Sequence, residues 1–282
     1  ALLGGMATTG PYVLPKLHDS QASRQAAYQV AMKVFANKLC LAEQPSLPQL
    51  EDEPFCHPLY VQIAALLALQ GSQPRSAEAV TRALIGHERR YWQKVLSDIP
   101  VAASLNEESA GLLMALATLA NGLPVLRAGN AIWSEAGGDS KFFKPLFNRM
   151  AQLYPARQGL LGLRPDLLGE ALVAQVLLSS QGVDLLHAIL GSKESSVRRS
   201  ALTVLARMLR HRPELASVIE PVLIKHFIRC AEDCVAVMIE TPSCLSRCIE
   251  NAFTKLDVQI KNQACGILEK YFDEDTLPLT DL

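Results

Sequence analysis

The segment YPARQGLLGLRPD, residues 154–166, decides the fold because it interrupts a chain whose residue spacing is helical almost everywhere else. Its glycines and arginines break the helical pattern and favour a short β-hairpin. We therefore expect a mainly α protein in which one small piece of β-structure marks a separate subdomain.

Helical patterns precede the hairpin at residues 76–96, 107–122 and 141–153. The segment PVLRAGNAIW, residues 124–133, is expected to be a short connection between the last two of these helices. Three helices followed by a small hairpin is the order of a winged helix-turn-helix unit. The sequence therefore predicts a winged-helix domain over residues 76–166.

A helical subdomain is predicted before this unit, over residues 11–75. The stretch FCHPLYVQIAALLAL, residues 55–69, predicts a buried helix with His57 and Pro58 at its start. Proline is tolerated there because its missing N–H would have no partner in the first helical turn. An earlier helix covers residues 21–39 and carries one apolar stripe that we expect to face the core. The stripe consists of Ala27, Val30, Ala31, Val34, Phe35 and Leu39.

Helix follows helix with short links over residues 167–272. Residues 195–227 have the helix–turn–helix cadence of an α-solenoid repeat of the TPR or HEAT kind, with the turn at His211–Pro213. A second and less regular pair spans residues 243–271. We expect these pairs to lean on the winged unit, since a solenoid normally needs at least three repeats. The last segment, residues 273–282, is predicted to be a flexible tail.

Composition places the chain among ordered globular proteins. Hydrophobic residues make up 49% of its 282 residues, charged residues make up 20%, and the formal net charge is −1. A protein that binds nucleic acid through bulk electrostatics usually carries a strongly basic domain or stripe. We therefore expect no nucleic-acid partner.

Compartment is indicated by the lack of targeting signals. No apolar run reaches the roughly 18 residues of a transmembrane helix, and the opening ALLGGMATTGPYV lacks the basic region of a signal peptide. The seven cysteines are odd in number and lie mostly in helical patterns, which favours free thiols. We expect a cytoplasmic protein with no membrane partner. The opening also differs from a natural start, so we expect a fragment of a longer protein.

Motifs of enzymes do not occur in the sequence. It contains no GxxxxGK[ST] loop for phosphate, no GxSxG nucleophile elbow and no HExxH metal helix. We therefore expect no catalytic residues in this chain.

One metal-like set is formed by His226, Cys230 and Cys234, and Cys244 and Cys248 repeat its four-residue interval. Zinc accepts nitrogen and sulfur ligands in a tetrahedron. Cysteines four residues apart on a helix differ from the close CxxC pairs of most structural zinc sites, and buried cysteine is a common small hydrophobic residue. Core packing is therefore the favoured interpretation, with metal binding and redox chemistry as alternatives, and we expect no metal.

Two basic stretches could contact a ligand. In HERRYWQK, residues 87–94, we expect Tyr91 and Trp92 to anchor the helix in the core while the basic side chains face water. The second stretch is expected to be a solvated repeat surface, with a ligand-binding concave face as the alternative. Its arginines are Arg198, Arg199, Arg207, Arg210 and Arg212. The candidate recognition helix at residues 141–153 is mostly apolar, which favours protein packing over DNA binding.

Several stretches together resemble one family, the signal-transduction ATPases with numerous domains (STAND) of the NB-ARC and NACHT kind in bacteria. LPKLHDSQASRQAAYQVAMKVFANKL (14–39) resembles the helical segment after the nucleotide-binding core, and CHPLYVQIAALLAL (56–69) resembles the segment with the GxP loop. ALIGHERRYW (83–92) with EESAGLLMALATLANG (107–122) resembles the start of the winged-helix domain, and LYPARQGLLGLRPDLLGEALV (153–173) resembles its end. SALTVLARMLRHRPELASVIEPVL (200–223) resembles the repeats that follow.

The resemblance implies a nucleotide-contacting segment. Pro58 is similar to the proline that approaches the adenine of bound ADP or ATP, with His57 and Leu59 on either side. Cys56 departs from the pattern, because the GxP loop has glycine there. The family's P-loop and its acidic partner are not in this chain, and neither is a clear winged-helix histidine for the β-phosphate. The resemblance therefore leaves two alternatives: the P-loop lies upstream in a longer protein that is an ATPase, or this chain belongs to a degenerate member that has lost it.

The resemblance also implies a function. A closed state would hold ADP between the core and the winged unit, and exchange to ATP would expose an oligomerising surface, in bacterial antiviral defence or other signal transduction. The expected partner is a protein trigger or another copy of the protein, bound through the winged-helix and repeat surfaces. Two alternatives stay open: an α-helical scaffold that binds a protein without nucleotide, and a winged-helix DNA-binding regulator.

Overall fold

The structure is a computed structural model that describes residues 20–41, 50–72, 76–97, 107–123, 126–157, 159–164, 166–240 and 245–269. Within these ranges helices dominate, so the prediction of a mainly α protein is confirmed. The chain divides into two compact units, Ala1–Gly86 and His87–Leu282. The domain boundaries predicted from the sequence stay predictions. The expected flexible tail lies outside the described residues.

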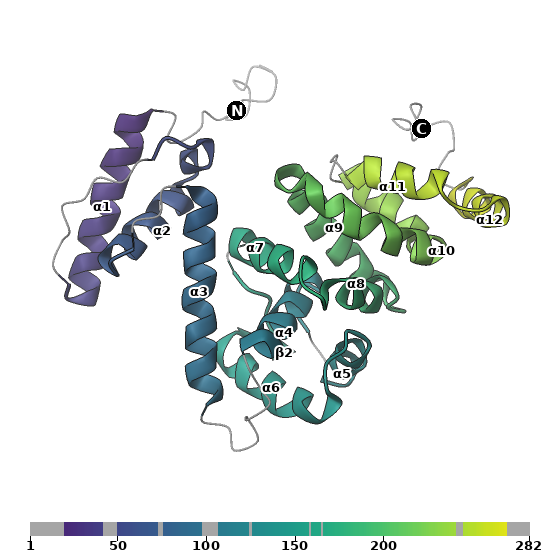
Figure 1. The fold of residues 1–282 in the computed structure, drawn as a ribbon, viewed down its shortest axis with the longest axis horizontal. Coiled ribbons are helices and arrows are strands. Elements are labelled where there is room, and N and C mark those ends of the chain that lie inside the picture. The colour runs from purple at the N-terminus through teal and green to yellow at the C-terminus, as the bar shows by residue number, and fades with distance from the viewer. Residues whose placement is uncertain are drawn as a thin grey trace, which may run out of the picture. The chain divides into compact units, whose positions relative to one another are not determined.

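The first unit is built on a pair of helices with a short turn between them. Its elements are α1 (Gln21–Leu39), the 3-10 turn η1 (Glu53–Cys56), α2 (Pro58–Leu69) and the beginning of α3 (Ala77–Leu96). Figure 1 shows α1 lying alongside α2, and the two helices share many contacts. Their common core contains Tyr28 from α1, Phe55 from η1 and Val61 from α2. The helix predicted to begin at Pro58 is therefore confirmed.

The buried face of α1 differs from the predicted stripe. Ala31 is buried, and Ala27 and Phe35 are partly buried against the core. Val30 is 65% exposed, and Val34 and Leu39 are 46% exposed, so the prediction was wrong for these three residues. Apolar residues occur on every side of this helix, so periodicity alone could not select a face. The buried residues of α1 are Arg24, Tyr28, Ala31, Met32 and Ala36.

The second half of α3 is anchored in the core by Trp92 and by Leu96, which is 1% exposed. Trp92 is fully buried, as predicted, and its Nε1 donates to Tyr154 Oη at 2.8 Å. Tyr154 in turn donates to the carboxylate of Glu88. Burial and, next, this hydrogen bond to Glu88 raise the pKa of Tyr154 well above its usual value. Tyr91 is 45% exposed, so its predicted place in the core was wrong.

The second unit continues with helices that enclose one hairpin. The elements up to the hairpin are α4 (Glu107–Leu119), α5 (Leu126–Glu135), α6 (Ser140–Leu153), β1 (Pro155–Ala156) and β2 (Gly159–Leu160). Those after it are α7 (Asp166–Leu177), α8 (Gly182–Leu190), α9 (Ser195–His211), the 3-10 turn η3 (Pro213–Leu215), α10 (Ala216–Glu240), α11 (Leu245–Thr254) and α12 (Val258–Leu268).

Helix α5 was not predicted, because its segment was expected to be only a short connection, and that prediction was wrong. Trp133 is buried and its ring lies 6.1 Å from that of Phe143 on α6. Gly129 allows this packing, since a Cβ there would lie 2.9 Å from Phe143 Cζ. A glycine inside a short helix lowers the helical signal of the sequence. Packing on α6 and α8 compensates for that weak propensity.

The predicted β-hairpin is present, and its second strand also pairs with the residue that follows α4. β1 and β2 are antiparallel, with Pro155 opposite Leu160 and Ala156 opposite Gly159. Leu123, just after α4, exchanges two backbone hydrogen bonds with Leu160, at 2.8 and 3.2 Å. The segment that follows α4 is thereby tied to the hairpin that follows α6.

Helix α7 approaches α4 very closely. A Cβ on Gly169 would lie 2.7 Å from the carbonyl oxygen of Leu163 and 2.8 Å from Thr118 Cγ2, so no larger residue fits without movement. Thr118 Oγ1 also accepts the backbone N–H of Leu163 at 3.1 Å. Glycine in the LRPDLLGE segment is therefore explained by close helix packing.

Helices α9 and α10 are joined by a buried ion-pair network. Asp233 on α10 is 1% exposed, and Arg198 Nε and Arg199 Nε donate to its two carboxylate oxygens at 2.7 and 2.9 Å. The predicted turn at His211–Pro213 is confirmed by the end of α9 and the start of η3.

No single helix in the described ranges is long and apolar enough to cross a membrane. By length and composition, the pair Asp166–Leu177 and Gly182–Leu190 meets the criterion together, with a bend of 113° between the two helices.

The close approach of α7 to α4 predicts a cost for a single methyl group. Gly169→Ala should lower the free energy of unfolding by about 1–3 kcal/mol, because the backbone of Leu163 has to move. Gly266→Ala on α12 is the matched control, since a Cβ there has no atom within 4 Å. The control should be neutral or slightly stabilising. Urea denaturation measures both, and equal midpoints for the two variants would contradict the packing described.

Candidate functional site

The sequence-predicted site residues His57, Pro58 and Leu59 form the start of α2. His57 is the N-cap residue, and its Nδ1 accepts the backbone N–H of Leu59 at 3.3 Å. Pro58 occupies the first helical position, where its fixed φ suits the helix and its missing N–H costs nothing. The local explanation for the proline is therefore sufficient for the fold, and a ligand is not needed to account for it.

The chemistry offered by this helix start follows from the cap. Because Nδ1 of His57 accepts a hydrogen bond, the neutral imidazole carries its proton on Nε2. His57 is exposed, whereas Pro58 and Leu59 are half-buried. The ring of Tyr60 stands edge-on to both His57 and Phe55, at centroid distances of 6.5 and 6.3 Å. The result is an apolar step, made by Pro58 and Leu59, beside one exposed N–H donor.

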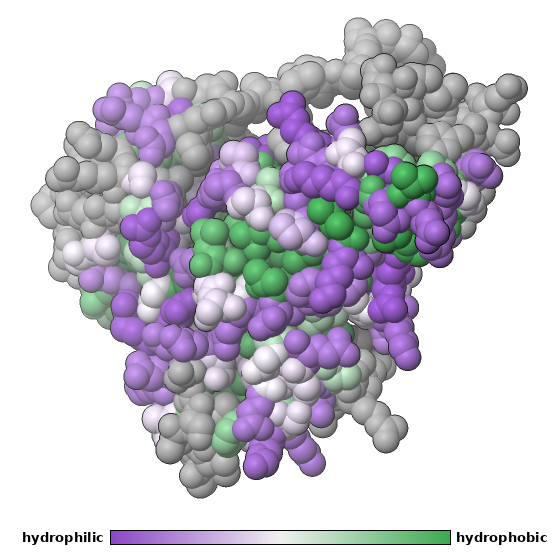
Figure 2. All heavy atoms as spheres, turned by 45° about the vertical axis from the view of Figure 1, so that its right-hand side comes forward, coloured by the Kyte–Doolittle hydropathy of each residue, from purple (hydrophilic) through white to green (hydrophobic). Residues whose placement is uncertain are grey.

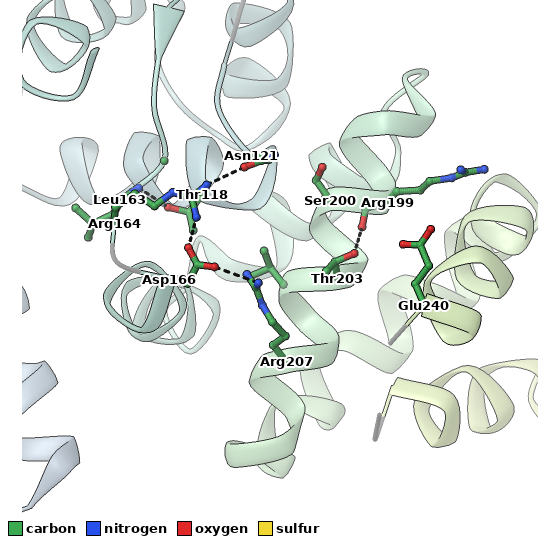
Figure 3. Close-up of a pocket in the computed structure, with 12 residues that line it drawn as sticks. Thr118, Asn121, Leu163, Arg164, Asp166, Arg199, Ser200, Thr203, Arg207 and Glu240 are labelled. Carbon is green, nitrogen blue, oxygen red and sulfur yellow. Dashed lines mark hydrogen bonds and ion pairs between the residues drawn. The ribbon is translucent and has the colours of Figure 1, made fainter. Parts of the chain in front are cut away.

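A second candidate site is a pocket of about 410 Å³ in the second unit. It lies where the end of α4 and the start of α7 face α9, and Glu240 at the end of α10 also lines it (Figure 3). A volume in this range suits a small ligand. The LRPDLLGE segment, residues 163–170, contributes three of its lining residues, Leu163, Arg164 and Asp166.

The charges of Arg164, Asp166 and Arg207 in this pocket are paired within the protein. Figure 3 shows Asp166 between two guanidinium groups. Arg164 donates to Asp166 and also to Asn121 Oδ1, and Arg207 Nη1 lies 3.1 Å from Asp166 Oδ2. Arg207 Nε lies 2.8 Å from Glu170, whose pKa is raised by burial and held down by this arginine. The geometry favours a clasp between α7 and α9 over a vacant anion site.

The arginine run of α9 is thus only partly a solvated surface. Arg210 is exposed, as predicted. Arg198 is 8% exposed and bonded to Asp233, so the prediction was wrong for this residue. Charged residues in a helical repeat look alike in sequence whether they face water or a buried partner. The pairing of Arg198 with Asp233 spans 35 positions and has no local signal.

The metal-like set is separated in the structure. Cys230 and Cys234 are buried, which confirms core packing for these two, and Cys230 Sγ lies 3.4 Å from the carbonyl oxygen of Leu190. His226 Nε2 instead lies 3.0 Å from Nδ1 of His187 on α8. Burial lowers the pKa of both histidines. Among the described residues, which exclude Cys244, no three His, Cys, Asp or Glu side chains are placed to hold a metal ion.

Comparison with known proteins adds no identification. No family model, curated protein or solved structure matches the chain.

The burial of the cysteines predicts their reactivity. Burial raises the pKa of Cys230 to about 12 and that of Cys234 well above its usual value, so both are protonated at pH 8. Alkylation by iodoacetamide should be at least about a hundredfold slower at these thiols than at exposed Cys40 and Cys265. Mass spectrometry of timed digests of the native chain measures the rates. Equal labelling of Cys230 and Cys40 would show that α10 is not packed as described.

Proposed function

We propose that this chain is the gating part of a STAND-type signalling ATPase, a part that binds the adenine end of ADP or ATP and does no catalysis itself. In this proposal ADP bridges the nucleotide-binding core of a longer protein and a winged-helix unit of this chain in a closed state. Exchange from ADP to ATP releases surfaces that bind another copy of the protein or a protein trigger. The output would be antiviral defence or another form of bacterial signal transduction.

The observation that carries the proposal is the order of elements from α4 to β2. A helix, a pairing residue, two further helices and a hairpin follow one another, and Leu123 pairs with Leu160 of the hairpin. This order, with the first short strand beside the last, is typical of a winged helix. It supports a winged-helix unit that begins at α4, later than the residue 76 proposed from the sequence.

The start of α2 fits an adenine base. Pro58 and Leu59 supply a half-buried apolar step, and a proline ring loses little conformational freedom when a base stacks on it. His57 adds an exposed Nε2–H that could donate to a ring nitrogen of adenine. When bound, the nucleotide would supply the phosphate charge that distinguishes ADP from ATP. These three residues would only hold and orient its base.

The clasp between α7 and α9 supports transmission of a movement. Asp166 and Glu170 lie at the start of α7, directly after the hairpin, and both contact Arg207 on the first repeat helix. A change in the position of the hairpin would therefore be passed to the repeats through charged contacts. Nucleotide can drive such a change only if it binds the two arrangements with different affinity.

A protein-binding scaffold is the second candidate, and exposed apolar side chains favour it. Figure 2 shows small apolar patches among hydrophilic residues on the face that it presents. Within the second unit, Val258 is 72% exposed, Ile239 56% and Leu178 55%. A DNA-binding regulator has less support, because the exposed bases of α6 are only Lys141 and Lys144 and a DNA-binding protein typically makes about 6–10 phosphate contacts.

Replacing Pro58 tests the proposal. Adenosine should bind the chain with a dissociation constant in roughly the millimolar range, as expected for a small ligand without phosphate contacts. Pro58→Ala should weaken this binding severalfold while circular dichroism shows unchanged helix content, because alanine also suits the first helical turn. ADP should bind about as tightly as adenosine, since the contact is with the base. Ligand-observed NMR titration measures each affinity.

Pro221→Ala is the matched control for that experiment. Pro221 lies inside α10, is exposed, and belongs to the second unit. Its replacement should leave adenosine binding unchanged. If adenosine does not bind the wild-type chain, or binds both variants equally, the adenine contact at Pro58 is wrong and the scaffold becomes the better account.

A further inference from the structure

A buried arginine lies beneath the loop that leads to His57. Arg24 on α1 is 8% exposed, and among the described residues of the first unit it is the one buried charged side chain. Burying a guanidinium group is costly unless its donors are satisfied. Its partners therefore indicate what keeps it there.

The donors of Arg24 converge on the backbone of one short segment. Nη1 donates to the carbonyl oxygens of Leu50, Glu51 and Asp52, at 2.8, 3.0 and 3.3 Å. Nη2 lies 2.8 Å from Sγ of Cys56. A single guanidinium group thus holds both ends of residues 50–56, directly before the His57 cap.

The planar fork of arginine suits this task better than any other side chain. Three successive carbonyl groups share this one donor group, and that of Asp52 also accepts the backbone N–H of Phe55 at 3.0 Å. A buried carbonyl group that loses its donor destabilises the fold. A lysine has one nitrogen and could not reach the carbonyl groups and the sulfur atom together. Leu50 and Phe55 are fully buried beside these contacts, whereas Glu51 and Asp52 are exposed.

Cys56 also acquires a role from this contact. The family pattern has glycine at its position, and a glycine would offer Nη2 no partner. In this chain the sulfur atom ends the set of Arg24 contacts one residue before His57. Arg24 and Cys56 therefore act as a pair that fixes where the start of α2 lies.

We infer that Arg24, through residues 50–56 and the sulfur of Cys56, is a positioning residue that sets the His57–Leu59 segment for the adenine base. The inference rests on the proposed function for the identity of the ligand. The positioning itself rests on the hydrogen bonds alone. Arg24 does not touch the ligand.

Amide exchange in two conservative variants tests the positioning. Arg24→Lys keeps the charge but loses the fork, and Cys56→Ala removes only the sulfur contact. In both, the amides of Phe55 and Leu59, which bond to Asp52 O and His57 Nδ1, should exchange about tenfold faster. Residues 61–68 inside α2 should keep their wild-type rates. Lys33→Gln, an exposed change on α1, is the control and should alter neither set.

The outcomes separate the two claims. Unchanged exchange at Phe55 and Leu59 would overturn the positioning role, and faster exchange throughout α2 would show that Arg24 merely stabilises the fold. Adenosine affinity measured on the same samples should fall severalfold in both variants and stay unchanged in Lys33→Gln. Equal affinity despite a loosened loop would overturn the inference. A wild-type chain that binds no adenosine would refute the proposed function, while the exchange rates still decide the positioning.

Discussion

The hydroxyl group of Thr118 holds together the segments on which the second unit depends. It accepts the N–H of Leu163 after the hairpin and donates to the carbonyl of Met114 within α4. A Cβ on Gly162 or Gly169 would lie 2.8 Å from Thr118 atoms, so both glycines are required for this approach. The interaction ties α4, the exit of the hairpin and α7 into one body. The clasp to Arg207 on α9 starts from that body.

Local patterns predicted much of this arrangement. The start of α2 at Pro58 and the hairpin within residues 154–166 were predicted correctly. Helix caps and turns depend on neighbouring residues, so the sequence alone indicates them. Helix α5 was missed because Gly129 weakens a helix that packing on Phe143 restores. The buried face of α1 was partly mispredicted, because the helix carries apolar residues on every side. Only its contact with α2 determines which side is buried.

Residues of the candidate sites were predictable from the sequence where their role depends on neighbouring residues, and not where it depends on distant ones. His57 and Pro58 were found because a cap and a first-turn proline are local features. Arg24 contacts residues 26 to 32 positions away, and Arg207 reaches Asp166 across 41 positions, so periodicity carries no sign of either. The LRPDLLGE segment belongs to a stretch that was quoted only for its resemblance to a family. The roles of Gly169, Asp166 and Glu170 follow from their contacts with α4 and α9. Long-range polar contacts are thus what the sequence left unspecified.

We propose that adenine binds at the start of α2. The most direct measurement is photolabelling of the chain with an azidoadenine analogue of ADP, followed by mass spectrometry of the labelled peptides. The account predicts label on a peptide that contains His57–Leu59, and loss of that label when excess unmodified ADP is present. Label confined to other peptides, or label that ADP does not reduce, would contradict it.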